Sequence, residues 1–358
     1  MRALPILLLV LSIAGKPARA DGIFSPERQL TELAEGIYEI RHQDPYPGWV
    51  NGNTTVIIGE REVFVVDSCS MSADAREDIE QIRKWTNKPV RYLLNTHWHQ
   101  DHNAGNKDYV DAFPAVAIIA RRETREMIEA SRMTVPLDIA RDATAAQKQL
   151  QQSLETGKGA DGKPLTDAQK EEFKAKLTRV QRLFEEAKIY AAQLPTVEFD
   201  REMKIDLGNR EVQVKYLGRG NTAGDALVYL PKEKIVVTGD LLVHPVEYAF
   251  DGYPADWIET LQQIRKLDTE IIVPGHGEIL RDKVYLDQMI EVMKYIVAQV
   301  HEQFRHNSDA SLEDVKKAID LKPYRQRILG DDKQAGAFFD YSMGTKFVEL
   351  AYYEAKQR

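Results

Sequence analysis

Two stretches of the chain have the same expected order of elements, and this repeat constrains the fold more than any other feature. In the first stretch, the β-branched segments 54–58 and 63–67 flank a polar turn, as the strands of a hairpin do. Apolar residues at helical spacing over 75–85 predict a helix. Segment 90–94 is then expected to form a buried strand that leads to His97. The hairpin ends in an acidic residue, and the next strand leads to a histidine.

The second stretch repeats this order about 170 residues later. Segment 226–238 predicts another hairpin, and Asp240 follows it directly. A helix is expected over 257–267, followed by a short strand over 271–273 that leads to His276. An internal duplication of this kind predicts two similar halves, which we expect to form two sheets packed face to face with helices outside.

A polar helical insertion separates the halves, over about 136–194. Thr166 begins a capping-box pattern, and apolar residues then follow at three- and four-residue steps, which predicts a helical hairpin. This hairpin is either a lid on the site or a surface decoration that stabilises the domain. We expect the main domain to cover 21–282 and a C-terminal helical extension to cover 283–358, with no low-complexity linker between them.

Residues 1–20 have the pattern of a secretory signal peptide. Arg2 precedes an apolar run over 4–14, and a small-x-small cleavage pattern ends at Ala20. The apolar run is shorter than the roughly 20 residues that a bilayer-spanning helix needs. We therefore expect an exported protein, periplasmic or secreted, with no membrane attachment after cleavage; the alternative is a retained membrane anchor.

The charge balance excludes some classes of partner. Loss of Arg2, Lys16 and Arg19 with the leader would change the formal net charge from −8 to −11. Nucleic acid is not an expected partner, because phosphate binding needs a concentrated basic face. Cys69 is the only cysteine, so the chain can form no intrachain disulfide. A small-molecule substrate is the expected partner, and the oligomeric state is left open.

The run His97-Trp98-His99-Gln100-Asp101-His102 is the strongest chemical signal. It places three imidazoles and a carboxylate at the end of an expected buried strand. These are the ligands that zinc prefers outside cysteine sites. The alternative is a polar surface loop that binds nothing, but metal ligands are expected in loops that follow strands.

These motifs, in their order, resemble those of the metallo-β-lactamase superfamily. The resemblance consists of the hairpin residue Asp67, the H-x-H-x-D-H run, Asp240 after a glycine, and His276 between two glycines. It covers roughly 37–280, without the insertion and the tail. It implies an α/β fold, a four-layer αββα sandwich with metal ions at the sheet edges.

The resemblance also implies the metal ligands, in three sets: His97 and His99 for a first ion; Asp101, His102 and His276 for a second ion; and Asp240 between the two. It further implies that Asp67 lies behind the ligands and steadies the histidine loop, as hydrogen-bonded support generally does at metal sites.

One position departs from the family pattern. Where the family has a third histidine for the first ion, this chain has Asn221, whose neutral amide binds zinc less tightly than imidazole. We therefore expect zinc, one or two ions, with the Asp101, His102 and His276 position favoured. His244 is either a replacement ligand or a substrate-facing or structural histidine.

The expected function is a zinc-dependent hydrolase that uses metal-bound hydroxide to cleave an ester, thioester, lactone or β-lactam. Asp101 would orient the water and transfer its proton, and Asn221 would donate to the developing oxyanion. Asp240 stands where one group of β-lactamases has cysteine, and in this respect the chain resembles glyoxalase-II-type hydrolases. The sequence has no Gly-x-Ser-x-Gly elbow, and Cys69 is expected to be packed rather than reactive.

Two alternatives follow from Asn221. The chain could be a catalytically impaired, metal-binding periplasmic protein, because the first ion lacks its third histidine. A mononuclear iron oxygenase or redox enzyme of the same superfamily ranks lowest, because it needs that histidine.

Overall fold

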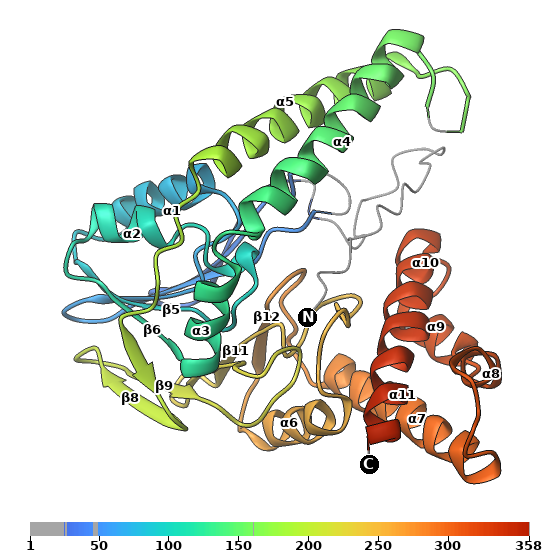
Figure 1. The fold of residues 1–358 in the computed structure, drawn as a ribbon. Helices are drawn as coiled ribbons and strands as arrows, with labels where there is room; N and C mark the ends of the chain where they lie inside the picture. Colours follow the sequence, from blue (N-terminus) through green and yellow to red (C-terminus); the bar gives the residue numbers. More distant parts are fainter. Residues whose placement is uncertain (1–24, 26, 46–48, 160, 358) are drawn as a thin grey trace.

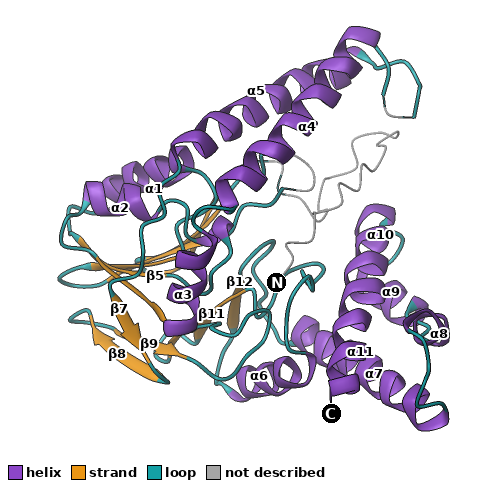
Figure 2. Ribbon diagram, in the orientation of Figure 1, coloured by secondary structure: helices purple, strands orange, loops and turns teal. Residues whose placement is uncertain are grey.

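Two β-sheets lie face to face between outer layers of helices. The computed structural model describes residues 25, 27–45, 49–159 and 161–357. Figure 1 shows α1 and α2 above one sheet and α6 below the other, and Figure 2 shows the strands gathered between these helices. The α/β, four-layer αββα prediction is therefore confirmed. The predicted signal peptide at 1–20 lies outside the described residues.

The first sheet has seven strands in the order of the chain. Strands β1 to β4 pair antiparallel, and β4 to β7 pair parallel. The β3–β4 hairpin is the one predicted from the first repeat. The strands are β1 Gln29–Ala34, β2 Ile37–Arg41, β3 Thr54–Ile58, β4 Val63–Val66, β5 Val90–Leu94, β6 Ala117–Arg121 and β7 Val197–Phe199.

The second sheet has five strands in the order β12-β11-β10-β9-β8. Strands β10 and β11 form the second predicted hairpin, and β11 pairs parallel with β12. This arrangement repeats that of β3, β4 and β5, so the internal duplication is visible in the topology. The strands are β8 Glu202–Asp206, β9 Glu211–Lys215, β10 Leu227–Leu230, β11 Ile235–Gly239 and β12 Ile271–Pro274.

Helices connect the parallel strands and form the insertion and the tail. Helix α1 joins β4 to β5, and α6 joins β11 to β12. The helices are α1 Ser72–Trp85, α2 Asn106–Ala112, α3 Arg122–Ser131, α4 Val135–Thr156, α5 Asp167–Ile189, α6 Pro254–Lys266, α7 Val284–His306, α8 Leu312–Ala318, α9 Lys322–Leu329, α10 Lys333–Tyr341 and α11 Val348–Gln357, with a 3₁₀ turn at Gln100–His102 and a π-helical turn at Ser342–Phe347.

Three apolar cores hold the four layers together, because both faces of both sheets are buried. Ile79 and Ile82 of α1 pack on one face of the first sheet, with Val65 and Leu93. The other face packs on the second sheet. The outer face of the second sheet packs on α6 and α7, where Trp257 is fully buried. Near-continuous burial is typical of strands covered on both sides.

The insertion forms the predicted hairpin of two helices, α4 and α5. Thr166 makes the predicted capping box with Gln169 at the start of α5. The two helices share an apolar core with Met71, and Arg179 donates to the carbonyl oxygen of Gln43 at 2.8 Å. Figure 1 shows the far ends of both helices (green) projecting away from the sheets. Among the described residues, no helix has both the length and the apolarity needed to cross a bilayer.

The C-terminal helices share a core with the sandwich. Phe339, Met343 and Phe347 belong to the same apolar cluster as Trp257 of α6 and Met289 of α7. The rings of Trp257 and Phe347 lie 6.2 Å apart, centre to centre. Figure 1 shows the helices after α7 (red) beside α6 and α7. Helix α7, the first helix of the extension, therefore covers the second sheet with α6, and the later helices pack on this layer.

A buried carboxyl group in the first sheet makes stability depend on pH. Burial raises the pKa of Glu39, in β2, to about 7 from the usual 4.5. Between these values the folded chain keeps a proton that the unfolded chain releases. The resulting stabilisation is fully present below about pH 4.5 and is lost as pH rises through about 7.

We therefore expect Glu39→Gln to remove part of this pH dependence. Between about pH 4.5 and pH 8, the free energy of unfolding should fall by roughly 3 kcal/mol less than in the unmodified protein. Urea unfolding in metal-free buffer at several pH values measures the difference. Glu35→Gln, at an exposed position, is the matched control. An unchanged pH profile in Glu39→Gln would contradict the prediction.

Candidate metal centre

The predicted ligands follow the C-terminal ends of parallel strands, which lie at one edge of the two sheets. The 97–102 run follows β5, Asp240 follows β11 directly, and His276 lies two residues beyond β12. Parallel neighbours end at the same edge, so each half of the duplication delivers its loop there. The backbone N–H of Asn53 donates to the carbonyl oxygen of Gly275 at 2.7 Å, which joins the two halves at this edge.

Six predicted ligands form one continuous cluster of polar atoms. Nε2 of His102 lies 3.1 Å from Nε2 of His276, which lies 3.1 Å from Oδ2 of Asp101. Nε2 of His97 lies 3.0 Å from Nδ1 of His99. Two sets can each surround one cation, with ligand atoms within 4.8 Å of one another: His97, His102 and Asp240; and Asp101, His102 and His276.

Asp240 lies between these two sets. Its Oδ1 is 3.3 Å from Nε2 of His102 and 3.5 Å from Nε2 of His276. Its Oδ2 is 3.5 Å from Nε2 of His97 and also 3.5 Å from Nδ2 of Asn221. One carboxylate oxygen therefore faces each half of the cluster.

The donor atoms of this cluster fit a metal ion. Oδ1 of Asn221 is buried and has no hydrogen-bond partner among the described residues. Oδ1 of Asp240 is also buried without a hydrogen bond, and its polar neighbours are the imidazoles of His102 and His276 at 3.3 and 3.5 Å. Buried polar atoms of this kind are costly unless something satisfies them. Imidazole and carboxylate are ligands that zinc accepts, and a shared cation would satisfy these oxygen atoms.

A hydrogen-bonded support lies behind the histidine loop. Asp67 accepts hydrogen bonds from the backbone N–H and the hydroxyl of Thr96, both at 2.8 Å. Its Oδ2 also lies 2.9 Å from Nδ1 of His102. With a φ of 59°, Asp67 adopts a left-handed backbone conformation that costs energy for a residue with a side chain. The support therefore aims Nε2 of His102 at the cluster.

Close backbone packing places His276. A Cβ atom on Gly275 would lie 2.0 Å from Oδ1 of Asp240, so this position requires glycine. The side-chain amide of Asn53 donates to the carbonyl oxygen atoms of Pro274 and Gly277, at 3.0 and 3.1 Å. The loop that carries His276 is therefore held from the opposite half of the molecule.

The remaining predicted residues differ in their placement. Nε2 of His99 faces Oδ2 of Asp251 at 3.9 Å, on the loop after β11. His244 stays outside both ligand sets, and its ring packs on Tyr285 with centres 4.9 Å apart. Its backbone N–H donates to the carbonyl oxygen of His276 at 3.2 Å. His99 also lies outside both ligand sets, although its Nδ1 is 3.0 Å from Nε2 of His97. The structure thus brings five of the six predicted ligands into the two sets and places His99 at their edge.

The electrostatics of the cluster favour positive charge at His102 and His276. Burial acts to lower the pKa of His276, but Asp240 and Asp101 outweigh it and raise the pKa to about 9. Burial also opposes the charged form of His102, yet Asp240 and Asp101 raise its pKa well above the usual value. Burial and the neighbouring His102 hold the pKa of His97 well below its usual value. The carboxylates thus create a position that attracts a cation.

A third group of potential ligands, His42, Cys69 and Asp78, has a different character. Nδ1 of His42 lies 2.7 Å from the carbonyl oxygen of Gly52, and its Nε2 lies 2.8 Å from Oδ2 of Asp78. Both ring nitrogens therefore face acceptors, as in an imidazolium. Arg28 donates to Oδ1 of Asp78 at 2.7 Å, and burial raises the pKa of the Cys69 thiol well above its usual value. The group is an ion-pair network next to a protonated, packed thiol.

This network supports the metal-ligand loop from behind. The N–H of Gly52 donates to the carbonyl oxygen of Asp101 at 3.2 Å, while its carbonyl oxygen faces His42. A Cβ atom on Gly52 would lie 2.7 Å from Cε1 of His102. Glycine therefore allows the segment before β3 to contact the histidine loop.

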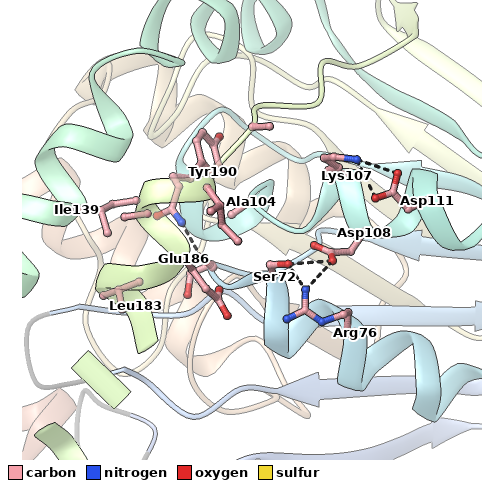
Figure 3. A pocket seen from close by; sticks show the side chains of 15 residues that line it. Ser72, Arg76, Ala104, Lys107, Asp108, Asp111, Ile139, Leu183, Glu186 and Tyr190 are labelled. Atoms are coloured by element: carbon pink, nitrogen blue, oxygen red, sulfur yellow. Dashed lines mark hydrogen bonds and ion pairs between the residues drawn. The ribbon is translucent and has the colours of Figure 1, made fainter. Parts of the chain in front are cut away.

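A pocket of mixed polarity lies on the other side of that loop, between α1, α2 and α5. Figure 3 shows Arg76, Asp108, Glu186 and Tyr190 among its lining side chains. Arg76 donates to Asp108 at 3.0 Å. None of the predicted metal ligands lines this pocket. Lys107 pairs with Asp111, and Glu186 pairs with Arg182 outside the pocket. The pocket holds no histidine, so it does not replace the histidine cluster as the candidate site.

Sequence reasoning missed several residues that shape the site. Thr96 could have been predicted from the sequence, because it adjoins His97 and its hydroxyl can donate to Asp67. Asn53 had no local signal, because its partners Pro274 and Gly277 lie more than 220 residues away in the sequence. The ring of Tyr248 packs on that of His276, with centres 4.9 Å apart.

Sequence comparison identifies relatives over most of the chain. The profile of the metallo-beta-lactamase superfamily matches residues 47–276. The metallo-beta-lactamase type 2 of Elizabethkingia meningoseptica is 22% identical over 279 residues, which cover 76% of this chain and 87% of that protein. The linear primary-alkylsulfatase of Pseudomonas sp. (strain ATCC 19151) is 21% identical over 252 residues, 67% of this chain. That match spans only 44% of the alkylsulfatase.

Solved structures have the same fold. DIM-1 metallo-beta-lactamase superposes with a TM-score of 0.52 at 18% identity, covering 75% of this chain and 98% of that one. The sec-alkylsulfatase Pisa1 from Pseudomonas sp. has a TM-score of 0.62 at 16% identity, covering 91% of this chain and 50% of that one. The profile match, which covers more than half of the chain and includes the clustered histidines and aspartates, decides the assignment. The chain therefore belongs to the metallo-beta-lactamase superfamily.

Proposed function

We propose that this protein is a zinc-dependent hydrolase in which an activated water cleaves an ester, thioester, lactone or β-lactam bond. One observation carries the proposal: imidazoles from both halves of the duplication lie within 3.5 Å of the Asp240 carboxylate. Its Oδ1 faces His102 and His276, and its Oδ2 faces His97. Oδ1 is buried and forms no hydrogen bond with the described residues, which supports a cation at this position.

We assign the ligands in two sets. Asp101, His102 and His276 would hold the more tightly bound ion, because two imidazoles and a carboxylate meet there within 3.6 Å. His97 and His99 would hold the other ion, and Asp240 would contact both. The second position lacks a third imidazole, so we expect it to bind zinc more weakly.

Zinc at this edge would polarise the scissile carbonyl and lower the pKa of water from about 15.7 to about 7. We assign the proton transfer to Asp101. Its side chain is 16% exposed, whereas that of Asp240 is 2% exposed, so Asp101 is the carboxylate that solvent reaches. The oxygen atom of Asp101 that does not face the ion would take the proton of the attacking water and pass it to the leaving group.

Asn221 is fully buried and its amide N–H faces Oδ2 of Asp240. We propose that this contact positions Asp240 and that the unpartnered Oδ1 of Asn221 faces the weaker ion. A hydrogen bond from Asn221 to the developing oxyanion is the other role, and it requires substrate to reach this buried amide.

The similarity to an alkylsulfatase adds a second candidate reaction, hydrolysis of an alkyl sulfate ester. Both reactions need a small-molecule substrate and an activated water. We further propose that the mature protein acts in the periplasm or outside the cell, because of the leader pattern at 1–20. A metal-binding protein without catalysis is the contrasting hypothesis.

An assay panel distinguishes these functions. Zinc-loaded protein would be tested on nitrocefin, a thioester, a lactone, p-nitrophenyl esters and an alkyl sulfate. We expect turnover of at least one acyl substrate, abolished by a chelator and restored by zinc. Turnover of the alkyl sulfate alone would replace the acyl reaction with the sulfate one. Tight zinc binding without any turnover would contradict a hydrolase and favour the metal-binding alternative.

Replacing the support behind His102 tests the ligand assignment. Asp67→Asn removes one of the oxygen atoms that orient Thr96 and His102, so zinc affinity should fall by about 10- to 100-fold. Chelator competition measures the affinity, and circular dichroism checks the fold. Asp111→Asn, which alters an exposed carboxylate paired with Lys107, is the control. An affinity that is equal in both variants would show that Asp67 does not act through the ligands.

Replacing Asn221 with the histidine that the family has at this position tests the binding of a second ion. Asn221→His adds an imidazole beside Asp240 and His97, and zinc content should rise toward two ions per chain with higher turnover. Elemental analysis gives the stoichiometry. Asn221→Gln, which keeps an amide, should stay at the unmodified value. If Asn221→His binds no more zinc, the weaker position is not a degraded form of the family site.

A further inference from the structure

Four aromatic side chains form a connected group beside the metal centre, here called the aromatic cluster: Tyr248, Phe250, Phe338 and Tyr341. The ring of Phe250 has its centre 6.2 Å from Tyr248, 6.2 Å from Phe338 and 6.1 Å from Tyr341. The rings of Tyr248 and Phe338 meet edge to face at 5.5 Å. Two of the rings come from the loop after β11, and two come from α10 in the C-terminal extension.

The loop that carries Phe250 contacts both sides of the metal centre. Tyr248 packs on the ring of His276, with centres 4.9 Å apart. Asp251 lies 3.9 Å from Nε2 of His99. Phe250 lies between these two contacts in the chain, two residues after Tyr248 and directly before Asp251.

Phe250 is exposed to an extent that core packing does not explain. It is 46% exposed, although its three aromatic neighbours are buried or half-buried. Large exposed apolar side chains that adjoin a site are typical of ligand-binding surfaces. Six other large apolar side chains are exposed in the described part of the chain, and Phe250 is distinguished by its direct neighbour Asp251, which contacts a predicted ligand.

The C-terminal extension fixes this loop in place. The hydroxyl of Ser342, directly after α10, accepts a hydrogen bond from the backbone N–H of Ala249 at 3.0 Å. The same hydroxyl donates to the carbonyl oxygen of Glu247. Ser342 is fully buried. The extension therefore supplies two rings of the cluster and also anchors the backbone that carries the other two.

We propose that the aromatic cluster is a subsite for an apolar alkyl or aryl group of the substrate, built jointly by the loop after β11 and the C-terminal extension. This inference rests on the proposed function and specifies the substrate class. A substrate with its scissile bond at the metal centre would lay its apolar group on the face of Phe250. The C-terminal helices would thus determine specificity.

Binding of two carboxylates to the zinc-loaded full chain tests the subsite without catalysis. Calorimetry would compare 4-phenylbutyrate with acetate, which share the metal-binding group and differ in the apolar part. We expect 4-phenylbutyrate to bind at least about 10-fold more tightly. Equal affinities in the unmodified protein would overturn the proposal.

Variants test whether the preference for 4-phenylbutyrate over acetate depends on the aromatic cluster. Phe250→Ala should lower the affinity for 4-phenylbutyrate by about 5- to 20-fold and leave that for acetate within about twofold. Phe338→Ala should act in the same direction, and Phe338→Leu should retain much of the affinity. Tyr353→Ala, an exposed aromatic position on α11, is the matched control. Zinc content and the melting temperature confirm that each variant is folded and loaded.

The outcomes separate this inference from the proposed reaction. A preference for 4-phenylbutyrate that depends on Phe250, in a protein without hydrolase turnover, would support the subsite and contradict the reaction. Turnover with a preference that Phe250→Ala does not change would support the reaction and overturn the subsite. A change of oligomeric state in Phe250→Ala, without a change of ligand preference, would identify an interface between copies and also overturn the subsite.

Discussion

Burial of several imidazoles and carboxylates at one sheet edge is the constraint on which the rest of the structure depends. Nε2 atoms of His102 and His276 lie 3.1 Å apart, both rings are buried, and Asp240 and Asp101 lie beside them. Taking such groups out of water is expensive unless each has a partner. A shared cation supplies that partner for both classes of donor. The duplicated fold is what brings them together, because each half ends a parallel strand pair at the same edge.

The support around the cluster explains why the polar residues behind it are buried as well. Asp67 orients His102, and Asn53 holds the loop of His276 from the other half of the chain. The ion pair of His42 with Asp78 fixes Gly52 against the loop that carries Asp101 and His102. The side chains of Asp67, His42 and Asp78 have hydrogen-bond partners within the protein, whereas Oδ1 of Asp240 forms no hydrogen bond with the described residues. These three residues therefore build the site, and Asp240 is expected to bind the ion.

Local patterns in the sequence predicted the strands, helices and ligands whose signal lies within a few neighbouring residues. Alternation and helical spacing gave the two hairpins and the helices α1 and α6, and the capping box of Thr166 formed as expected. Contacts across the fold had no such signal. Asn53 meets residues more than 220 positions away, and the apolar residues of α10 have the same spacing whether they pack in a core or line a site. The joint construction of the aromatic cluster therefore became visible only in the structure.

X-ray absorption spectroscopy of the zinc-loaded full chain tests whether the clustered imidazoles and carboxylates bind the ion, because it reports the atoms around the zinc. We expect nitrogen and oxygen neighbours at about 2.0–2.2 Å, with the scattering signature of imidazole. A sulfur neighbour at about 2.3 Å would contradict this site, because Cys69 would then bind the ion within the group of His42 and Asp78. A zinc spectrum without imidazole scattering would also contradict it.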